Sequence, residues 1–153
     1  MGSPELPASS GLATRAWHQI NWAAGHRRVR SLQRRIVQAV QAGAWRKVKR
    51  LYLLVHSFAA RALAIKRVTA NTGKKTPGIA GELWETPEKK AVAVERIGRW
   101  RSYRPVPLRR LHIPKKNGKK RPLSIPAMSE RGKQALWLQA LEPMAETLAD
   151  CHS

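Results

Sequence analysis

The side chains in this sequence that could do chemistry are mostly cations. Thirty Lys and Arg residues stand against nine Asp and Glu, which gives a formal net charge of +21 over 153 residues. No acidic residue lies between Glu5 and Glu82, and none lies between Arg96 and Ser129. A surface that only has to stay dissolved usually mixes both signs, so long basic segments indicate a polyanionic partner. Nucleic acid is the first candidate for that partner.

The densest group of cations lies in residues 103–126, YRPVPLRRLHIPKKNGKKRPLSIP. Four apolar residues alternate with other residues on either side of an Asn-Gly pair: Leu111, Ile113, Leu123 and Ile125. This pattern predicts a β-hairpin. All four are odd-numbered, so they share one face only if odd positions pair with odd. A two-residue turn would pair odd with even, and we therefore expect a three-residue loop with a bulge at Gly118.

Cations crowd the tip of this predicted hairpin, at Lys115, Lys116, Lys119, Lys120 and Arg121. An alternative explanation is that lysines at a strand edge have the single role of blocking aggregation. Five cations in seven residues exceed that need. Clustered cations bind phosphates by charge and by release of counterions. We expect the tip to meet the phosphates of a nucleic acid or of a nucleoside triphosphate.

Further cations lie on predicted helices and loops. Apolar residues three or four apart, from Val29 to Val40, predict a helix that stops near Gly43, and a second helix is predicted over residues 44–68. The complete set of candidate RNA-binding residues is Arg27, Arg28, Arg34, Arg35, Arg46, Lys47, Arg50, Lys74, Lys75, Arg109, Arg110, Lys116, Lys119 and Lys120. Such residues hold a nucleic-acid backbone without reading its sequence. The second helix alone would also fit a membrane surface or a calmodulin-type partner.

Aromatic residues and histidines are less informative. Trp17, Trp22 and Trp84 could stack on bases, although packing between short helices and loops is the favoured explanation for each of them singly. Trp45 and Trp137 lie on helical apolar stripes and are expected in the core. The five histidines have no metal-ligand spacing, and His112 on the hairpin is expected either to touch phosphate or to face solvent.

Carboxylates are scarce. Phosphoryl transfer by two metal ions needs clustered carboxylates, whereas this sequence has a single aspartate, Asp150. We therefore expect no catalytic residue, no metal site and no cofactor in this chain. Its one cysteine, Cys151, excludes an internal disulfide, and a reduced bacterial cytoplasm is the expected setting. No apolar run is long enough to cross a bilayer, so no membrane partner is expected.

The remaining segments define the expected architecture. Residues 1–14 are expected to be flexible, and residues 71–81, NTGKKTPGIAG, to form a loop without regular structure. A third helix is predicted over residues 86–97, and a last one starts at Ser129 and is kinked or split at Pro143. The fold class is α+β and mainly α, with N-terminal helices, one basic hairpin and a C-terminal helix.

The order and spacing of several short motifs resemble the N-terminal portion of group II intron-encoded reverse transcriptases, which are also maturases. The matching pieces are WHQINW at 17–22, LQRRI at 32–36, NTGKKTPGI at 71–79, YRP at 103–105, RR at 109–110, IPK at 113–115, NGK at 117–119, RPL at 121–123, IP at 125–126, Arg131, QAL at 134–136 and LEP at 141–143. Each piece is weakly specific alone, and together they are specific.

The resemblance implies an organisation and a function. Residues 15–81 look like the family's N-terminal extension, which helps to bind intron RNA and template, and residues 82–153 look like part of its fingers. By similarity, Lys115 and Arg121 would neutralise the triphosphate of an incoming nucleotide. The full-length parent would copy RNA into DNA with magnesium and would assist intron splicing and mobility. Partners would be intron or template RNA, a DNA primer, or a separate palm polypeptide.

Two departures from the family pattern matter. Ala80 stands where the family usually has Asp, and the sequence ends at Ser153, where the family continues into a palm with catalytic aspartates. We therefore expect a truncated reading frame, an expressed fragment or one piece of a split enzyme. Two alternatives remain open: a stand-alone basic RNA-binding or ribosome-associated module, and a remnant without a selected function.

Overall fold

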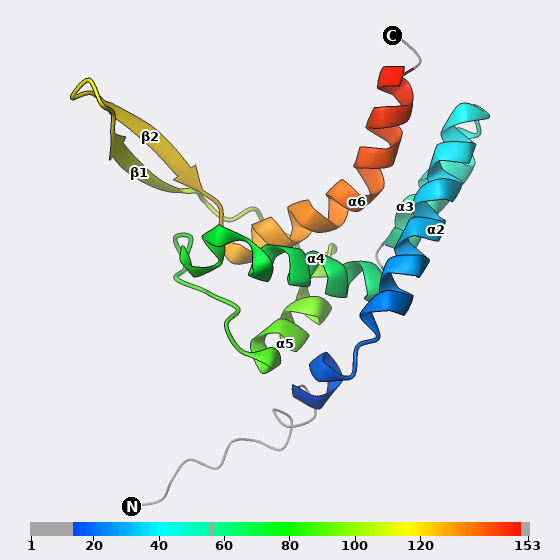
Figure 1. Cartoon of the computed structure of the whole chain (residues 1–153), viewed down its shortest axis with the longest axis horizontal. Helices are drawn as coiled ribbons and strands as arrows, with labels where there is room; N and C mark the ends of the chain where they lie inside the picture. Colours follow the sequence, from blue (N-terminus) through cyan, green and yellow to red (C-terminus); the bar gives the residue numbers. More distant parts are fainter. Residues whose placement is uncertain (1–13, 56, 151–153) are drawn as a thin grey trace, which may run out of the picture.

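The computed structural model describes residues 14–55 and 57–150, so nearly all of the segment predicted to be flexible lies outside the described residues. The elements in chain order are α2 (Trp22–Gln41), α3 (Trp45–Val55), α4 (Phe58–Ala70), the 3₁₀ helix η1 (Thr72–Lys75), α5 (Pro87–Ile97), β1 (Arg109–Pro114), β2 (Lys120–Ile125) and α6 (Met128–Asp150). The chain is mainly helical with a small antiparallel hairpin (Figure 1), which confirms the expected fold class.

Helix α2 forms as its apolar spacing predicts. Val29, Leu32 and Ile36 are buried on one side of it, and the Asn21 side chain accepts a hydrogen bond from the N–H of Ala24 at its start. The helix ends before Gly43, whose φ of +65° is the left-handed conformation that glycine adopts without strain. The predicted stop at Gly43 is therefore confirmed.

The single helix predicted over residues 44–68 is wrong, because the structure has two helices, α3 and α4. The Ser57 side chain accepts a hydrogen bond from the N–H of Ala60 and so caps the start of α4. The apolar spacing continues across this break, which is why periodicity alone missed it. Trp45, predicted in the core, is half exposed; it is the first residue of α3, and its neighbour Arg46 is exposed as well.

Helix α6 is the central element and packs against α2, α3, α4 and α5. It continues through Pro143 and changes direction along its length (Figure 1), so the predicted kink is present and a split is not. Pro143 has no N–H to donate to the carbonyl oxygen of Gln139, four residues earlier. The Gln33 side chain donates to that carbonyl instead, at 3.1 Å, while the Gln139 side chain donates to the Ala60 carbonyl at 3.0 Å. These two bonds join α2, α6 and α4.

The hairpin has the predicted register, with Leu111 opposite Leu123 and odd positions paired with odd throughout. The N–H of Lys115 donates to the carbonyl of Lys119 at 2.6 Å, which leaves a loop of residues 116–118. The N–H of Gly118 donates to the Lys115 carbonyl at 3.1 Å, and Gly118 has a φ of +76°. The three-residue loop with a bulge at Gly118 is confirmed.

The other segments differ from expectation only in detail. Helix α5 begins with Thr86 as its cap and Pro87 in its first turn, as predicted. The loop over residues 71–81 contains the short helix η1, although the rest of it is irregular. No helix in the described part of the chain is long and apolar enough to cross a membrane.

Candidate nucleic-acid interface

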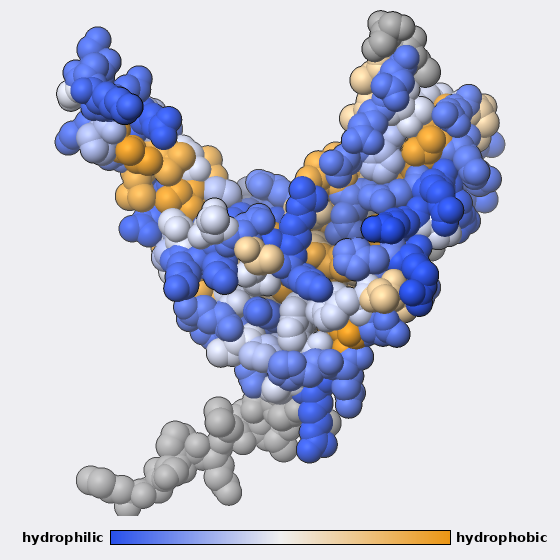
Figure 2. All heavy atoms as spheres, in the orientation of Figure 1, coloured by the Kyte–Doolittle hydropathy of each residue, from blue (hydrophilic) through white to orange (hydrophobic). Residues whose placement is uncertain are grey.

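The five cations at the hairpin tip are exposed to solvent. Within residues 14–55 and 57–150, the ion pairs are Arg61 with Glu95 at 3.5 Å and Arg96 with Glu82 at 2.8 Å, so no tip cation is paired with a carboxylate. Figure 2 shows hydrophilic atoms over the projecting end of the hairpin and apolar atoms along its stem. The positive charges of the tip are therefore not compensated within the described part of the molecule.

The register divides the cations of the hairpin between its two faces. Arg121 lies opposite Ile113 and shares the odd-numbered face with the exposed side chains of Leu111 and Leu123. Lys120 shares the even-numbered face with Arg110. The backbone bond between Lys115 and Lys119 comes two positions beyond the Ile113–Arg121 pair, which makes Lys115 a diagonal neighbour of Arg121. Diagonal neighbours stand about 7–8 Å apart, which one phosphate chain can bridge.

A half-buried arginine at the start of α6 fixes the base of the hairpin. Arg131 donates to the carbonyls of Gly73 at 2.9 Å, Thr76 at 2.5 Å and Pro126 at 3.0 Å, and burial lowers the pKa of its guanidinium. It therefore joins both ends of η1 to the segment that follows β2. Among the sequence predictions Arg131 appeared only as one matching residue of the family pattern. A cation in the first turn of a helix opposes the helix dipole, and this was the available signal that it has a specific partner.

Close packing holds the same loop against the hairpin. A Cβ at Gly78 would lie 2.6 Å from the Cα of Ala127, so only glycine fits there. Arg109, a candidate RNA-binding residue, is half buried and donates to the Pro77 carbonyl at 3.3 Å. The exposed Lys74 and Lys75 lie in η1, beside the hairpin base. The structure thus brings these two lysines and the hairpin into one region.

The cations of α2 and α3 form a second region. At 100° per residue, Arg27, Arg30 and Arg34 share one face of α2, whereas Arg28 and Arg35 lie on another. The first three line a groove of about 1130 Å³ between α2 and α6. The opposite side of this groove carries three carboxylates, here called the acidic wall: Glu142, Glu146 and Asp150. Arg46, Lys47 and Arg50 are exposed on α3.

The structure does not bring the two basic regions together. The hairpin and the free ends of α2 and α6 project from the body as two separate arms, with open space between them (Figures 1 and 2). A single short ligand therefore cannot contact the hairpin tip and the groove of α2 at once. A long polyanion that follows the surface between the arms can reach both.

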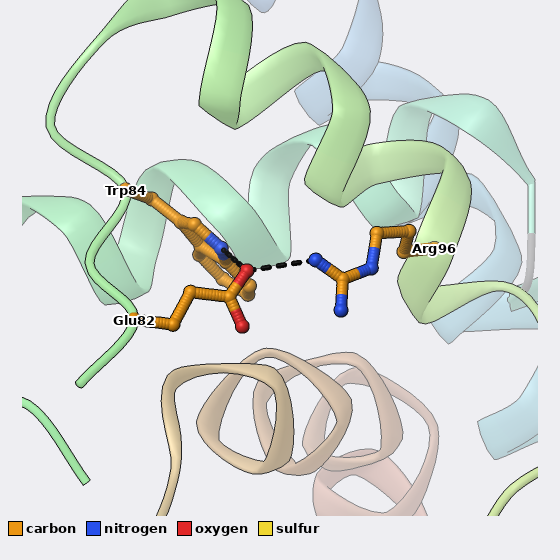
Figure 3. A network of polar contacts seen from close by, with 3 residues as sticks. All are labelled: Glu82, Trp84 and Arg96. Carbon is orange, nitrogen blue, oxygen red and sulfur yellow. Dashed lines mark hydrogen bonds and ion pairs between the residues drawn. The ribbon is translucent and has the colours of Figure 1, made fainter. Parts of the chain in front are cut away.

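The tryptophans that could have stacked on bases serve in packing. Trp17 and Trp84 are buried, and the rings of Trp17 and Trp22 meet edge to face, 5.1 Å between centroids. The indole N–H of Trp84 donates to Glu82 Oε1 at 3.0 Å, and Arg96 binds the same oxygen (Figure 3). The rings of Trp17 and Trp84 are consequently covered by the protein's own side chains, whereas Trp22 is half buried.

The structure also shows the environment of Trp137 and of His112. Trp137, expected in the core, is half buried and meets the rings of Tyr52 and Trp100. His112 is exposed on the hairpin, so it faces solvent when no ligand is present.

Comparison with known proteins identifies the family once this arrangement is known. The model of the N-terminal domain of reverse transcriptase matches residues 17–97, from the segment before α2 to the end of α5. The chain belongs to this family. The matched region of this reverse transcriptase N-terminal domain includes the basic helices α2 and α3 and the loop with Lys74 and Lys75. The boundary predicted at Gly81 stays a prediction.

A curated relative extends the similarity beyond the matched domain. The chain is 34% identical over 124 residues to Protein YkfC of Escherichia coli (strain K12). The aligned part covers 78% of this chain and 32% of the relative, so the chain spans about a third of the length of that protein. The relative's name states no activity.

Proposed function

We propose that this chain is the RNA-binding N-terminal part of a group II intron reverse transcriptase and maturase. The observation that carries the proposal is the set of exposed, unpaired cations at the hairpin tip of a chain that belongs to a reverse transcriptase family. A hairpin that projects from the body can enter the groove of a folded RNA or lie along a strand. The phosphates would supply the affinity and make it dependent on salt.

Each group of candidate residues has a role in this proposal. The hairpin tip and the two lysines of η1 hold the template backbone, whereas the cations of α2 and α3 hold intron RNA. Lys115 and Arg121, diagonal neighbours on the hairpin, bind the triphosphate of an incoming nucleotide. These contacts are with phosphate and sugar, so they position RNA without reading its sequence.

The proposal assigns no catalysis to this chain alone. The sequence has one aspartate, and the transfer of a nucleotide needs two metal ions held by clustered carboxylates. In the full-length parent, magnesium and the carboxylates would come from a palm, on the same chain or on a separate polypeptide, together with a DNA primer.

A two-part experiment tests the proposal. The first part measures the affinity for a group II intron RNA and for an unrelated structured RNA of equal length, by gel shift at matched salt. We expect tighter binding of the intron RNA, whereas equal affinities would favour a general RNA-binding module. The second part supplies primer, template, nucleotides and magnesium, and we expect no extension. A product from this chain alone would refute the assignment.

A further inference from the structure

A third cationic site lies away from the hairpin tip and from the groove of α2. A hollow of about 360 Å³ opens between the end of α5, the segment over residues 98–106 and the first turns of α6. Pockets for small ligands begin at about 300 Å³. The hollow therefore has room for a phosphate group with an attached sugar.

The charges around this hollow are unbalanced. It is lined by four cations, Arg96, Arg99, Arg104 and Lys133, and by one carboxylate, Glu130. Arg96 is already paired with Glu82 at 2.8 Å. The other three cations have no carboxylate within ion-pair distance among the described residues, so their charges are available to an anion.

Aromatic rings hold Lys133 in place. Its Nζ lies 3.8 Å from the ring centre of Tyr103 and 5.0 Å from that of Trp100. Partial burial lowers the pKa of Lys133, and the positive charge of Arg96 acts in the same direction, against Glu130. A bound anion would stabilise this partly desolvated ammonium.

The carboxylate of Glu130, which also lines the hollow, is held in place by a hydrogen bond. The hydroxyl of Tyr103 donates to Glu130 Oε2 at 2.7 Å, and this bond raises the pKa of Tyr103. Two hydroxyl groups, those of Ser102 and Ser129, also line the hollow and can donate to phosphate oxygens. Cations, of which Lys133 is held by aromatic rings, and hydroxyl donors around a small concave space are the components of a phosphate site.

We propose that this hollow binds a phosphate monoester, either that of a free mononucleotide or the terminal phosphate of a nucleic-acid strand. A monoester carries a charge of about −1.5 to −2 near pH 7, which suits three unpaired cations. A phosphodiester carries a single charge and therefore offers less to three unpaired cations than a monoester does. The inference goes beyond the proposed function, since it concerns a different set of residues and can hold or fail independently.

The test measures the binding of adenosine 5′-monophosphate to the whole chain by isothermal titration calorimetry in low salt, with adenosine as the uncharged probe. We expect the monophosphate to bind at least about tenfold more tightly than adenosine, as a charge-assisted site requires. The Arg104→Gln and Lys133→Gln variants should each weaken its binding by about fivefold or more. Equal binding of both probes would overturn the proposal.

Matched variants separate the hollow from general charge. Arg101→Gln removes an exposed arginine of the same segment, and Lys89→Gln an exposed lysine of α5, and neither residue lines the hollow. Both should leave the affinity for the monophosphate within about twofold. A similar loss in all four variants would show non-specific attraction and refute the site. Thermal unfolding followed by circular dichroism confirms that each variant is folded before it is compared.

Competition identifies the source of the phosphate. A short oligonucleotide with a 5′-phosphate that displaces the monophosphate, when its 5′-hydroxyl counterpart does not, assigns the site to strand ends. If neither oligonucleotide displaces the bound monophosphate, the site is assigned to free nucleotides. Equal displacement by both would show that phosphodiesters occupy the hollow and would overturn the proposal. The affinity of the hairpin tip for RNA is measured separately with tip variants. Failure of the proposed RNA-binding function would therefore be distinguishable from failure of the phosphate site.

Discussion

Replacement of Arg131 by Ala should loosen the base of the hairpin and destabilise the fold. The Arg131 side chain donates to three carbonyls from two separate segments, at 2.5–3.0 Å. A hydrogen bond from a charged donor contributes about 1.5–3 kcal/mol, and less where water can replace it. Because Arg131 is partly exposed, we expect the variant to lose about 2–4 kcal/mol of the free energy of unfolding.

The assay is urea unfolding followed by circular dichroism, with hydrogen exchange of the amides in residues 71–78 as a local measurement. Exchange there should speed up in Arg131→Ala even under conditions where the protein stays folded. Arg131→Lys keeps the positive charge but lacks the planar guanidinium group with its several N–H donors. It should therefore recover less than half of the free energy of unfolding that Arg131→Ala loses. Arg101→Ala, at an exposed arginine, is the control. A loss below about 0.5 kcal/mol in Arg131→Ala, with unchanged exchange, would refute the role of this residue.

Three further predictions follow from the same contacts. Gly78→Ala should lower the free energy of unfolding by about 2 kcal/mol or more, measured by urea unfolding, because the new Cβ would lie 2.6 Å from the Cα of Ala127. In a spectroscopic titration near 295 nm, Tyr103 should ionise above the ordinary range of tyrosine because of Glu130, and Glu130→Gln should shift the titration to lower pH; no shift would contradict the hydrogen bond. Neutralising the acidic wall with amides should tighten RNA binding by about tenfold in a gel shift, because the negative charge of the wall repels phosphate from the groove that the α2 arginines line. The control variant neutralises the same number of acids outside the groove, namely Glu85, Glu88 and Glu95. It should change the affinity for RNA much less, and an equal gain in affinity would refute this explanation.

The sequence predicted local structure well where one physical signal dominated. The parity of Leu111 and Leu123 determined the register of the hairpin, and Gly118 determined its bulge. The break between α3 and α4 was missed because the apolar stripe continues across it, and a serine cap in a helical pattern is a weak signal. Helix periodicity also cannot tell that Trp45 lies beyond the edge of the core.

The site was predicted less completely than the fold. The sequence could identify exposed cations, but not which of them would be used within the protein. Arg109 was expected to bind RNA, and the structure shows its guanidinium donating to Pro77. Arg131 and Lys133 required three-dimensional contacts, since their partners are carbonyls and rings from segments distant in the chain. The division of the α2 arginines between two faces follows from helix geometry, but the acidic wall opposite them depends on how α6 packs.

The proposal that the hairpin tip binds RNA through phosphate is tested most directly by the salt dependence of RNA affinity. The measurement compares the unchanged chain with a variant in which all five tip cations become Gln, by fluorescence anisotropy with a single-stranded RNA at several salt concentrations. Each lost phosphate contact on a single strand should reduce the slope of log affinity against log salt by about 0.7, so we expect a reduction of roughly 2–3.5. A control variant changes five cations outside both basic regions: Arg15, Lys66, Arg67, Lys89 and Arg101. A tip variant with the same slope and affinity as the unchanged chain, or as this control, would contradict the account.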